Sequence, residues 1–328
     1  MLKVFKIVGA VIGVLLVVSV GTFLWLSSSA EAKLAQKPVV HESNFPIPMP
    51  LSEEEIAELS RDGERPSDEE LAKIALDRAI ERGKHLLTAR YACADCHGAD
   101  YGGGTMVDDP AMGSLLGPNL TSGKGSVTKD YTAADWDRIV RHGIRKDGRP
   151  ALMPSEDFLA MSDRELGDIV AYIGAQPPVD KDVPESTLGP VGKILVATGR
   201  FRLAYETVDD HAKAHSTEPP RAEESVEFGK HLAQVCTGCH RKDLAGGPIV
   251  QGPPDWPAAA NLTPHEQGLG SWTFEEFEAA MRKGLRRDGS EMGVPMSAMT
   301  PYGQRMTETE MKALWLYLRS LPPTPMGT

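Results

Sequence analysis

All four cysteines of this 328-residue chain lie in two copies of the pentapeptide Cys-x-x-Cys-His. The first copy spans residues 93–97 and the second spans residues 236–240. Two thiols at this spacing can add across the two vinyl groups of one porphyrin, and the adjacent histidine then binds the iron as its proximal ligand. The pattern predicts two covalently bound haem c groups, each with its iron. The residues that would hold them are Cys93, Cys96, His97, Cys236, Cys239 and His240.

Other uses of paired cysteines fit this pattern less well. Two Cys-x-x-Cys pairs can make one zinc site with four ligands, but here the pairs lie far apart and a histidine follows each. A thioredoxin-like motif is expected once, inside a βαβ pattern. A disulfide framework is typical of short, cysteine-dense secreted domains. Structural zinc is the main alternative that stays open.

An uncharged apolar run from Ile7 to Leu26 lies near the N-terminus. It has the length, about 20 residues, that a helix needs to cross the hydrocarbon core of a bilayer. Lys3 and Lys6 precede it, which predicts a single-pass anchor in a bacterial inner membrane, with the rest of the chain in the periplasm. The alternative is a signal peptide cleaved near Ala30. The run exceeds the usual apolar region of a signal peptide, about 7–15 residues, which favours a retained anchor.

The charge of the chain restricts its partners. The formal net charge of −11 argues against nucleic acid, which calls for a basic footprint. Acidic residues gather at 53–55, 68–70 and 223–224. Such runs are usually solvated helix faces. The functional alternative is steering of a basic redox partner, an effect that weakens as salt rises.

The chain repeats one plan twice, which is the best guide to its architecture. Each copy has Gly-Lys-His-Leu before its haem motif and Asn-Leu-Thr after it. A helical stretch, an Asp-Gly turn and a closing helix before a Pro-Pro pair then follow in both copies. Ser162 and Thr307 begin capping boxes that open the closing helices. The matching segments are 83–86 and 229–232, 119–121 and 261–263, 147–148 and 288–289, and 163–174 and 308–318.

An all-α fold is predicted, because β-branched runs of period two are nearly absent from both copies. The apolar stretch from Val191 to Tyr205 is expected to be a helix or extended segment packed between the domains. The expected parts are a membrane anchor or signal sequence (1–30), an acidic lead segment (31–79), a first helical domain (80–180), an inter-domain segment (181–221) and a second helical domain (222–328). These two domains are called the first repeat and the second repeat below.

Each copy offers a methionine as the sixth iron ligand, between its Asp-Gly turn and its closing helix. Methionine at this position raises the haem potential and suits electron transfer, whereas an open position suits peroxide or ligand chemistry. The first copy offers Met153. Alignment of the closing helices places Met299 beside it, with Met296 as the reserve. Met161 and Met306 stand just before the capping boxes and are interpreted as packing residues at the helix entry.

The haem motif, the Gly-Pro-Asn-Leu-Thr loop at 117–121, the Leu-Met-Pro segment and the closing helix together resemble class I cytochrome c domains in tandem. The resemblance covers about residues 80–180 and 225–325, and its haem motif is highly specific. The chain is similar to membrane-bound multihaem cytochrome subunits that accept electrons from periplasmic dehydrogenases. The predicted fold is therefore an N-terminal transmembrane helix followed by two cytochrome c-like helical domains.

The resemblance also implies roles for the loop after each motif. It implies that the carbonyl of Pro118 accepts a hydrogen bond from the proximal histidine, and that Asn119 and Asn261 help to bind the cofactor. The second copy departs from the pattern, because Ala260 stands where the proline is expected. Cytochrome subunits of this kind often carry three haems, whereas this chain has two motifs.

The favoured function is a dihaem electron carrier without catalytic residues of its own. It would relay single electrons between a redox donor, such as a dehydrogenase subunit or quinol-linked complex, and an acceptor such as a terminal oxidase. The alternative is a dihaem cytochrome c peroxidase, which needs one haem with a vacant position and acid–base groups nearby. The histidines that could serve there, and are otherwise expected to be surface or structural residues, are His142, His211, His215 and His265.

Overall fold

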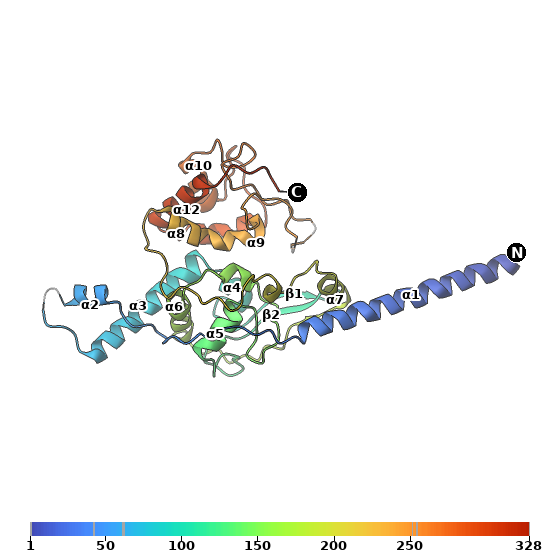
Figure 1. Cartoon of the computed structure of the whole chain (residues 1–328), viewed down its shortest axis with the longest axis horizontal. Coiled ribbons are helices and arrows are strands. Elements are labelled where there is room, and N and C mark those ends of the chain that lie inside the picture. Colours follow the sequence, from blue (N-terminus) through green and yellow to red (C-terminus); the bar gives the residue numbers. More distant parts are fainter. Residues whose placement is uncertain (1, 42, 61–62, 251, 254, 328) are drawn as a thin grey trace.

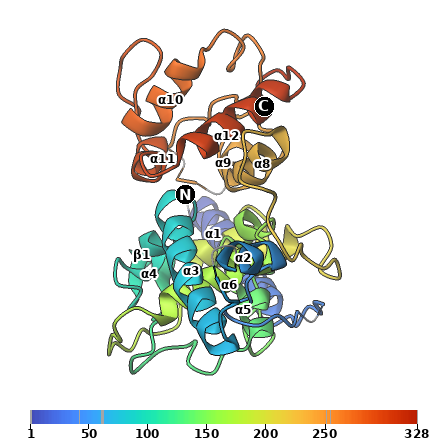
Figure 2. The ribbon, with the colours of Figure 1, turned by 90° about the vertical axis from the view of Figure 1, so that its left-hand side faces the viewer.

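The computed structural model describes residues 2–41, 43–60, 63–250, 252–253 and 255–327. Within these ranges the second repeat forms a lobe above the first repeat, and a long N-terminal helix projects from the lower lobe (Figure 1). The view turned by 90° shows the same two lobes, with part of the lead segment lying on the lower one (Figure 2).

The projecting helix, α1, runs from Leu2 to Leu34. No charged residue interrupts it between Lys6 and Glu31. The span Lys3–Leu34 has 32 residues, and its most apolar 18-residue window has a mean hydropathy of 2.6 and is not buried in the protein. By length and composition it could cross a membrane, and a signal sequence near the N-terminus would meet the same criteria.

Each repeat packs an early helix against its closing helix. In the first repeat α3 (Asp68–Ala89) packs on α6 (Asp163–Gly174). In the second repeat α8 (Val226–Leu232) packs on α12 (Glu308–Ser320). The closing helices therefore lie where the sequence predicts them, and α12 extends two residues further than expected.

Glycine at the start of each Gly-Lys-His-Leu segment permits these helix crossings. A Cβ added at Gly83 would overlap the backbone carbonyl of Asp168, and one added at Gly229 would overlap that of Ala313. The backbones come so close that no larger residue fits without displacement. The two copies thus use the same local sequence to solve the same packing problem.

Both predicted capping boxes are confirmed. Ser162 and Thr307 each accept a hydrogen bond from the backbone N–H three residues on, and the glutamates there, Glu165 and Glu310, accept one from the cap N–H. The lead segment uses the same device at Ser52 before α2 (Glu53–Leu59) and at Ser67 before α3. These reciprocal bonds satisfy N–H groups that a helix start leaves without partners.

Each lobe has its own apolar core. The first contains Leu87, Trp136, Met161 and Leu166, and the second contains Phe228, Phe277, Met311 and Leu314. Met161 is buried in the first core and Met306 packs against the second, as expected for packing residues. The remaining helices are α4 (Cys93–His97), α5 (Ala133–Val140), α7 (Pro190–Ala197), α9 (Thr237–His240), α10 (Phe274–Lys283) and α11 (Thr300–Gly303), with 3-10 helices η1 (Ser155–Phe158), η2 (Ala204–Glu206), η3 (Ala233–Cys236) and η4 (Met296–Met299).

A small sheet corrects the all-α prediction. The chain is rich in helix, but β1 (Gly104–Asp109), β2 (Gly113–Gly117) and β3 (Thr187–Leu188) form an antiparallel sheet in the order β1-β2-β3. The first two strands form a hairpin between the first haem motif and its Asn-Leu-Thr segment. Glycine at the strand ends and the short polar run 108–109 conceal the alternation by which strands are recognised.

The apolar stretch after residue 190 also differs from expectation. It does form a helix, α7, but the main contacts of α7 are with the end of α1 and with the sheet, so it does not separate the lobes. Ala30 is fully buried there beside Val196 and Leu203. Ion pairs flank the contact, Lys33 with Glu206 at 3.1 Å and Lys193 with Glu31 at 2.7 Å.

Candidate haem sites and the boundary between them

The first Cys-x-x-Cys-His motif forms the short helix α4, and its groups suit covalent haem attachment. All four cysteines of the chain are free thiols and none is joined in a disulfide. Burial raises the pKa of the Cys93 thiol to about 12 and also raises that of Cys96. These thiols form no disulfide that would compete with thioether formation.

His97 is held in the orientation of a proximal ligand. Its Nδ1 donates a hydrogen bond to the carbonyl oxygen of Pro118 at 2.9 Å, the bond that the resemblance implies. Because a carbonyl can only accept, Nδ1 carries the proton and Nε2 keeps its lone pair for a metal. Burial lowers the pKa of His97, so the imidazole is neutral at pH 7.

Asn119 holds this loop in place. Its side chain is fully buried, and its amide nitrogen donates to the carbonyl oxygen of Val179 at 2.7 Å. Its Oδ1 accepts hydrogen bonds from the backbone N–H and the hydroxyl of Thr121, at 2.9 and 2.8 Å. The amide thus braces the carbonyl that orients His97, and any direct contact of Asn119 with the cofactor stays a prediction.

The second motif, in η3 and α9, has the same geometry without the proline. His240 donates from Nδ1 to the carbonyl oxygen of Ala260 at 2.7 Å. Asn261 donates to the carbonyl oxygen of Thr324 at 2.7 Å and accepts from Thr263 at 2.8 Å through both its N–H and its hydroxyl. A backbone carbonyl thus fixes the second imidazole even though proline is absent. Burial also lowers the pKa of His240.

The candidate methionines lie in loops whose following residues contact the opposite lobe. Met153 is half-buried and stands just before η1, whereas Met299 ends η4 and is 37% exposed. Met296 begins η4 and is half-buried. The assignment of Met153 and Met299 as iron ligands, with Met296 in reserve, stays a prediction.

Each methionine loop contacts the haem motif of the other repeat. Beyond Met299, Tyr302 donates a hydrogen bond from its hydroxyl to Asp95 of the first motif at 2.7 Å. Beyond Met153, the carboxyl group of Asp157 lies so close to Gly238 of the second motif that a Cβ there would overlap it. The two motifs therefore both face the boundary between the lobes.

Two equivalent histidine–glutamate hydrogen bonds join the repeats at the same boundary. His85 lies 2.9 Å from Glu310, and His231 lies 2.8 Å from Glu165. The two histidines occupy the same position of the repeated Gly-Lys-His-Leu segment, and the two glutamates occupy the same position of the repeated capping box. Arg90 stands between them, 2.6 Å from Glu165 and 3.6 Å from Glu310. The boundary thus has approximate twofold symmetry.

Four histidines gather in the first lobe rather than at a haem motif. His142 is fully buried and contacts His41, His211 and His215. The sequence drew attention to three of these as isolated candidates, but not to His41, and it gave no sign that they meet. His265 lies apart, in a loop of the second repeat where its Nδ1 accepts from the N–H of Gln267.

Comparison with known families identifies both lobes. The family model for "Cytochrome c" matches residues 226–322, and the model for "Cytochrome C oxidase, cbb3-type, subunit III" matches residues 78–173. Each match contains one Cys-x-x-Cys-His motif and one closing helix. The chain is a c-type cytochrome with two cytochrome c domains, which indicates that it binds haem c covalently.

Known relatives indicate which kind of c-type cytochrome this chain resembles. The chain is 29% identical to the cytochrome c subunit of alcohol dehydrogenase (quinone) from Gluconacetobacter polyoxogenes, over 71% of this chain and 54% of that subunit. It is 27% identical to the fructose dehydrogenase cytochrome subunit of Gluconobacter japonicus, over 74% and 53%. It is 25% identical to the gluconate 2-dehydrogenase cytochrome c subunit of Pantoea cypripedii, over 75% and 60%. The chain resembles the cytochrome subunits of dehydrogenases and spans a little over half their length.

Proposed function

We propose that this protein is a dihaem cytochrome that relays single electrons on the periplasmic side of a bacterial inner membrane. The donor would be a dehydrogenase or a quinol-linked complex, and the acceptor a terminal oxidase or a soluble redox protein. The observation that supports this best is the reciprocal contact of each methionine loop with the other haem motif. An electron that enters at one haem would meet the second across this boundary.

In this proposal the chain attaches and orients two haems and excludes water from them. Bound haem iron would supply the one-electron chemistry. Cys93 and Cys96 would hold the first group and Cys236 and Cys239 the second. His97 and His240 would bind iron through Nε2, because the Nδ1–H of each ring donates a hydrogen bond to a backbone carbonyl oxygen. Met153 and Met299 would complete the coordination.

The packing of α1 supports a retained membrane anchor. Ala30 and Leu34 lie in the apolar cluster formed with α7, and Glu31 and Lys33 pair with residues of the inter-domain segment. Cleavage near Ala30 would remove a fully buried residue and break this cluster. A soluble product of unchanged stability after removal of residues 1–30 would contradict the anchor's structural role.

A dehydrogenase donor is supported by the relatives, whose names describe cytochrome subunits of such enzymes. The acidic net charge of −11 would favour a partner with a basic docking face, and association would then slow as salt rises.

The test is a haem count and a redox titration of the purified full-length protein, repeated with cyanide and peroxide. We expect two haems per chain, both six-coordinate and low-spin, that titrate in separate one-electron steps and bind cyanide slowly. Flash reduction should then show equilibration between the haems at a rate independent of protein concentration. A single haem, or equilibration only between molecules, would refute the relay.

The same titration distinguishes the dihaem peroxidase, which the comparisons do not favour. In a peroxidase one haem would become high-spin and react with peroxide once its partner was reduced. His142, His211 and His215, which could have supplied distal groups, lie together in a separate buried cluster.

A further inference from the structure

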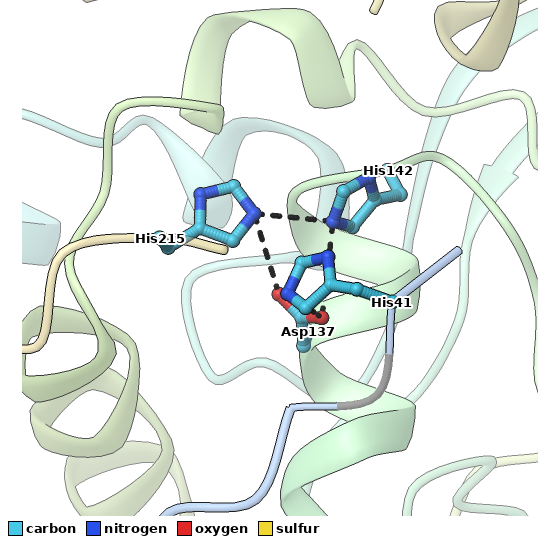
Figure 3. Close-up of side chains that lie close together, drawn as sticks. All are labelled: His41, Asp137, His142 and His215. Carbon is cyan, nitrogen blue, oxygen red and sulfur yellow. Dashed lines mark hydrogen bonds and ion pairs between the residues drawn. The ribbon is translucent and has the colours of Figure 1, made fainter. Parts of the chain in front are cut away.

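Four side chains from three distant segments converge inside the first lobe (Figure 3). His41 comes from the lead segment, Asp137 from α5, His142 from the turn after α5, and His215 from the inter-domain segment. One ligand atom from each lies within 4.8 Å of all the others. The haem chemistry described above requires none of these residues.

Three of the distances within this cluster lie close to the edge length of a tetrahedron around a metal ion. Nε2 of His215 lies 3.1 Å from Nε2 of His142. Oδ2 of Asp137 lies 3.6 Å from Nε2 of His41 and 3.8 Å from Nε2 of His142. Zinc binds nitrogen and oxygen at about 2.0–2.1 Å, so ligand atoms around it are separated by about 3.3 Å. The three observed distances, 3.1, 3.6 and 3.8 Å, thus lie on both sides of this value.

A chain of hydrogen bonds fixes His142 with its lone pair toward the centre of the cluster. Nε2 of His211 donates to the carbonyl oxygen of Tyr205 at 2.9 Å, so a His211 ring with a single proton accepts at Nδ1. It lies 3.0 Å from Nδ1 of His142, which must therefore donate. Nε2 of His142 then keeps its lone pair. The carbonyl group of Tyr205, at the other end of this chain of hydrogen bonds, determines this tautomer.

His41 is oriented in the same way. Its Nδ1 lies 3.1 Å from the carbonyl oxygen of His211 and must donate to it. Nε2 of His41 therefore carries a lone pair toward Asp137, with the hydroxyl of Ser43 2.9 Å away as its hydrogen-bond donor. Nε2 of His41 and Nε2 of His142 thus lie 3.6 and 3.8 Å from the same carboxylate oxygen. Their hydrogen-bond partners are the Ser43 hydroxyl and Nε2 of His215, which a cation bound between the rings and the carboxylate would replace.

Asp137 supplies the negative ligand. Its Oδ1 accepts from Nε of Arg141 at 2.6 Å, whereas its Oδ2 is buried and has no hydrogen-bond partner among the described residues. A buried carboxylate oxygen without a partner is costly.

We propose that His41, Asp137, His142 and His215 bind one zinc ion in a closed, four-coordinate structural site. Imidazole and carboxylate ligands suit zinc, and four protein ligands leave no open position for a substrate. The ion fastens the lead segment that follows α1 and the inter-domain segment to α5. It thereby fixes where the membrane-proximal helix and the second lobe join the first lobe.

The experiment uses full-length holoprotein prepared without a polyhistidine tag. The protein is loaded with one equivalent of zinc, dialysed against metal-free buffer, and analysed for zinc per chain by mass spectrometry. Because zinc is counted per chain, the result does not depend on the number of haems. We expect about one zinc per chain, with nitrogen and oxygen neighbours at about 2.0–2.1 Å in zinc absorption spectra.

Two variants and a control locate the site. His41→Ala and His215→Ala should each weaken zinc binding by more than about 100-fold, since even loss of an outer partner costs about 10–100-fold. Their haem spectra should not change, because neither residue approaches a haem motif. His265→Ala, which removes a histidine outside the cluster, should retain zinc. His41 lies in the lead segment, so His41→Ala remains informative if His215→Ala does not fold.

Three outcomes would overturn the proposal. The first is wild-type protein that keeps no zinc, which would leave a hydrogen-bonded histidine network only. The second is zinc that both variants retain, which would place it elsewhere. The third is copper or another metal taken up at the same residues in preference to zinc, which would refute the assignment of the ion.

Discussion

Replacing Glu165 with glutamine should weaken the boundary between the lobes strongly. The carboxylate is buried and lies 2.6 Å from Arg90 and 2.8 Å from His231 of the other repeat. It also accepts from the backbone N–H of Ser162 at 2.8 Å, as the last element of a capping box. Glutamine keeps the size of the side chain and one acceptor for the cap, but it removes the charge and presents an NH2 group to Arg90 and His231 in place of the other acceptor. The change thus tests the charged contact across the boundary.

The size of the effect follows from the protonation of Glu165. Burial alone would raise its pKa, but the His231 hydrogen bond and the Arg90 charge outweigh burial and lower the pKa from 4.5 to about 2. One pKa unit corresponds to about 1.4 kcal/mol, so the ionised group stabilises the fold by about 3 kcal/mol relative to its protonated form. Glutamine resembles the protonated form, so the variant should lose about this amount at pH 7.

The pH dependence has a definite sign. The pKa of Glu165 is lower in the folded chain than in the unfolded chain, so the unfolded chain binds its proton more readily. The stabilisation is therefore complete above about pH 4.5 and is lost as the pH falls toward 2. The difference in stability between wild type and Glu165→Gln should be constant near neutrality and should shrink over this acid range.

Urea unfolding followed by circular dichroism of the haem band would measure the effect. With slopes of about 1–3 kcal/mol per molar urea, the midpoint should fall by about 1–3 M. Glu276→Gln is the matched control, because Glu276 occupies the same capping-box position before α10 and pairs with Arg287 at 2.9 Å on the exposed surface. Equal midpoints for the two variants would show that the cost of burying Arg90 and Glu165 cancels their attraction, and would refute the reasoning.

Two further substitutions test the haem assignment and the packing. Met153→Ala should lower the potential of the first haem and allow cyanide to bind it quickly, whereas Met106→Ala, at an exposed residue of β1, should do neither; an unchanged potential in Met153→Ala would rule out Met153 as a ligand. Gly83→Ala should destabilise the first lobe by about 1–3 kcal/mol, as overpacking does, because its Cβ would overlap the carbonyl of Asp168. Gly174→Ala, with open space around its Cβ, is the control in thermal unfolding, and equal melting temperatures would show that the crossing relaxes freely.

Local signals in the sequence predict much of this protein. The haem motifs, the two repeats, the closing helices and the capping boxes at Ser162 and Thr307 depend on residues a few positions apart. Their geometry follows from backbone rules that operate within a turn or a loop. The hydrogen bond from His97 to Pro118 was accessible too, but only through resemblance, because 21 positions separate the two residues.

Features made by distant residues could not be predicted in this way. The hairpin 104–117 lacks a clean alternation of apolar residues, and the contact of α7 with α1 joins segments more than 150 positions apart. His41, Asp137 and His215 lie on segments whose meeting depends on the whole fold. A histidine carries no mark in the sequence that separates a surface residue from a buried ligand.

The reciprocal boundary gives the duplication of the sequence a physical meaning. His85 and His231 are equivalent residues, and so are Glu165 and Glu310, so each histidine–glutamate contact is the symmetry-related copy of the other. Such self-complementary contacts are those of a twofold dimer, here formed within one chain.

A symmetric frame by itself would give the two haem sites the same surroundings. In the proposed relay, the departures from symmetry would make the sites differ: Pro118 against Ala260 as the acceptors from His97 and His240, a sheet beside the first motif, and greater exposure of Met299 than of Met153. Because exposure and the hydrogen bonding of ligands tune haem potentials, the direction of electron flow would be set by these few residues and not by the shared frame.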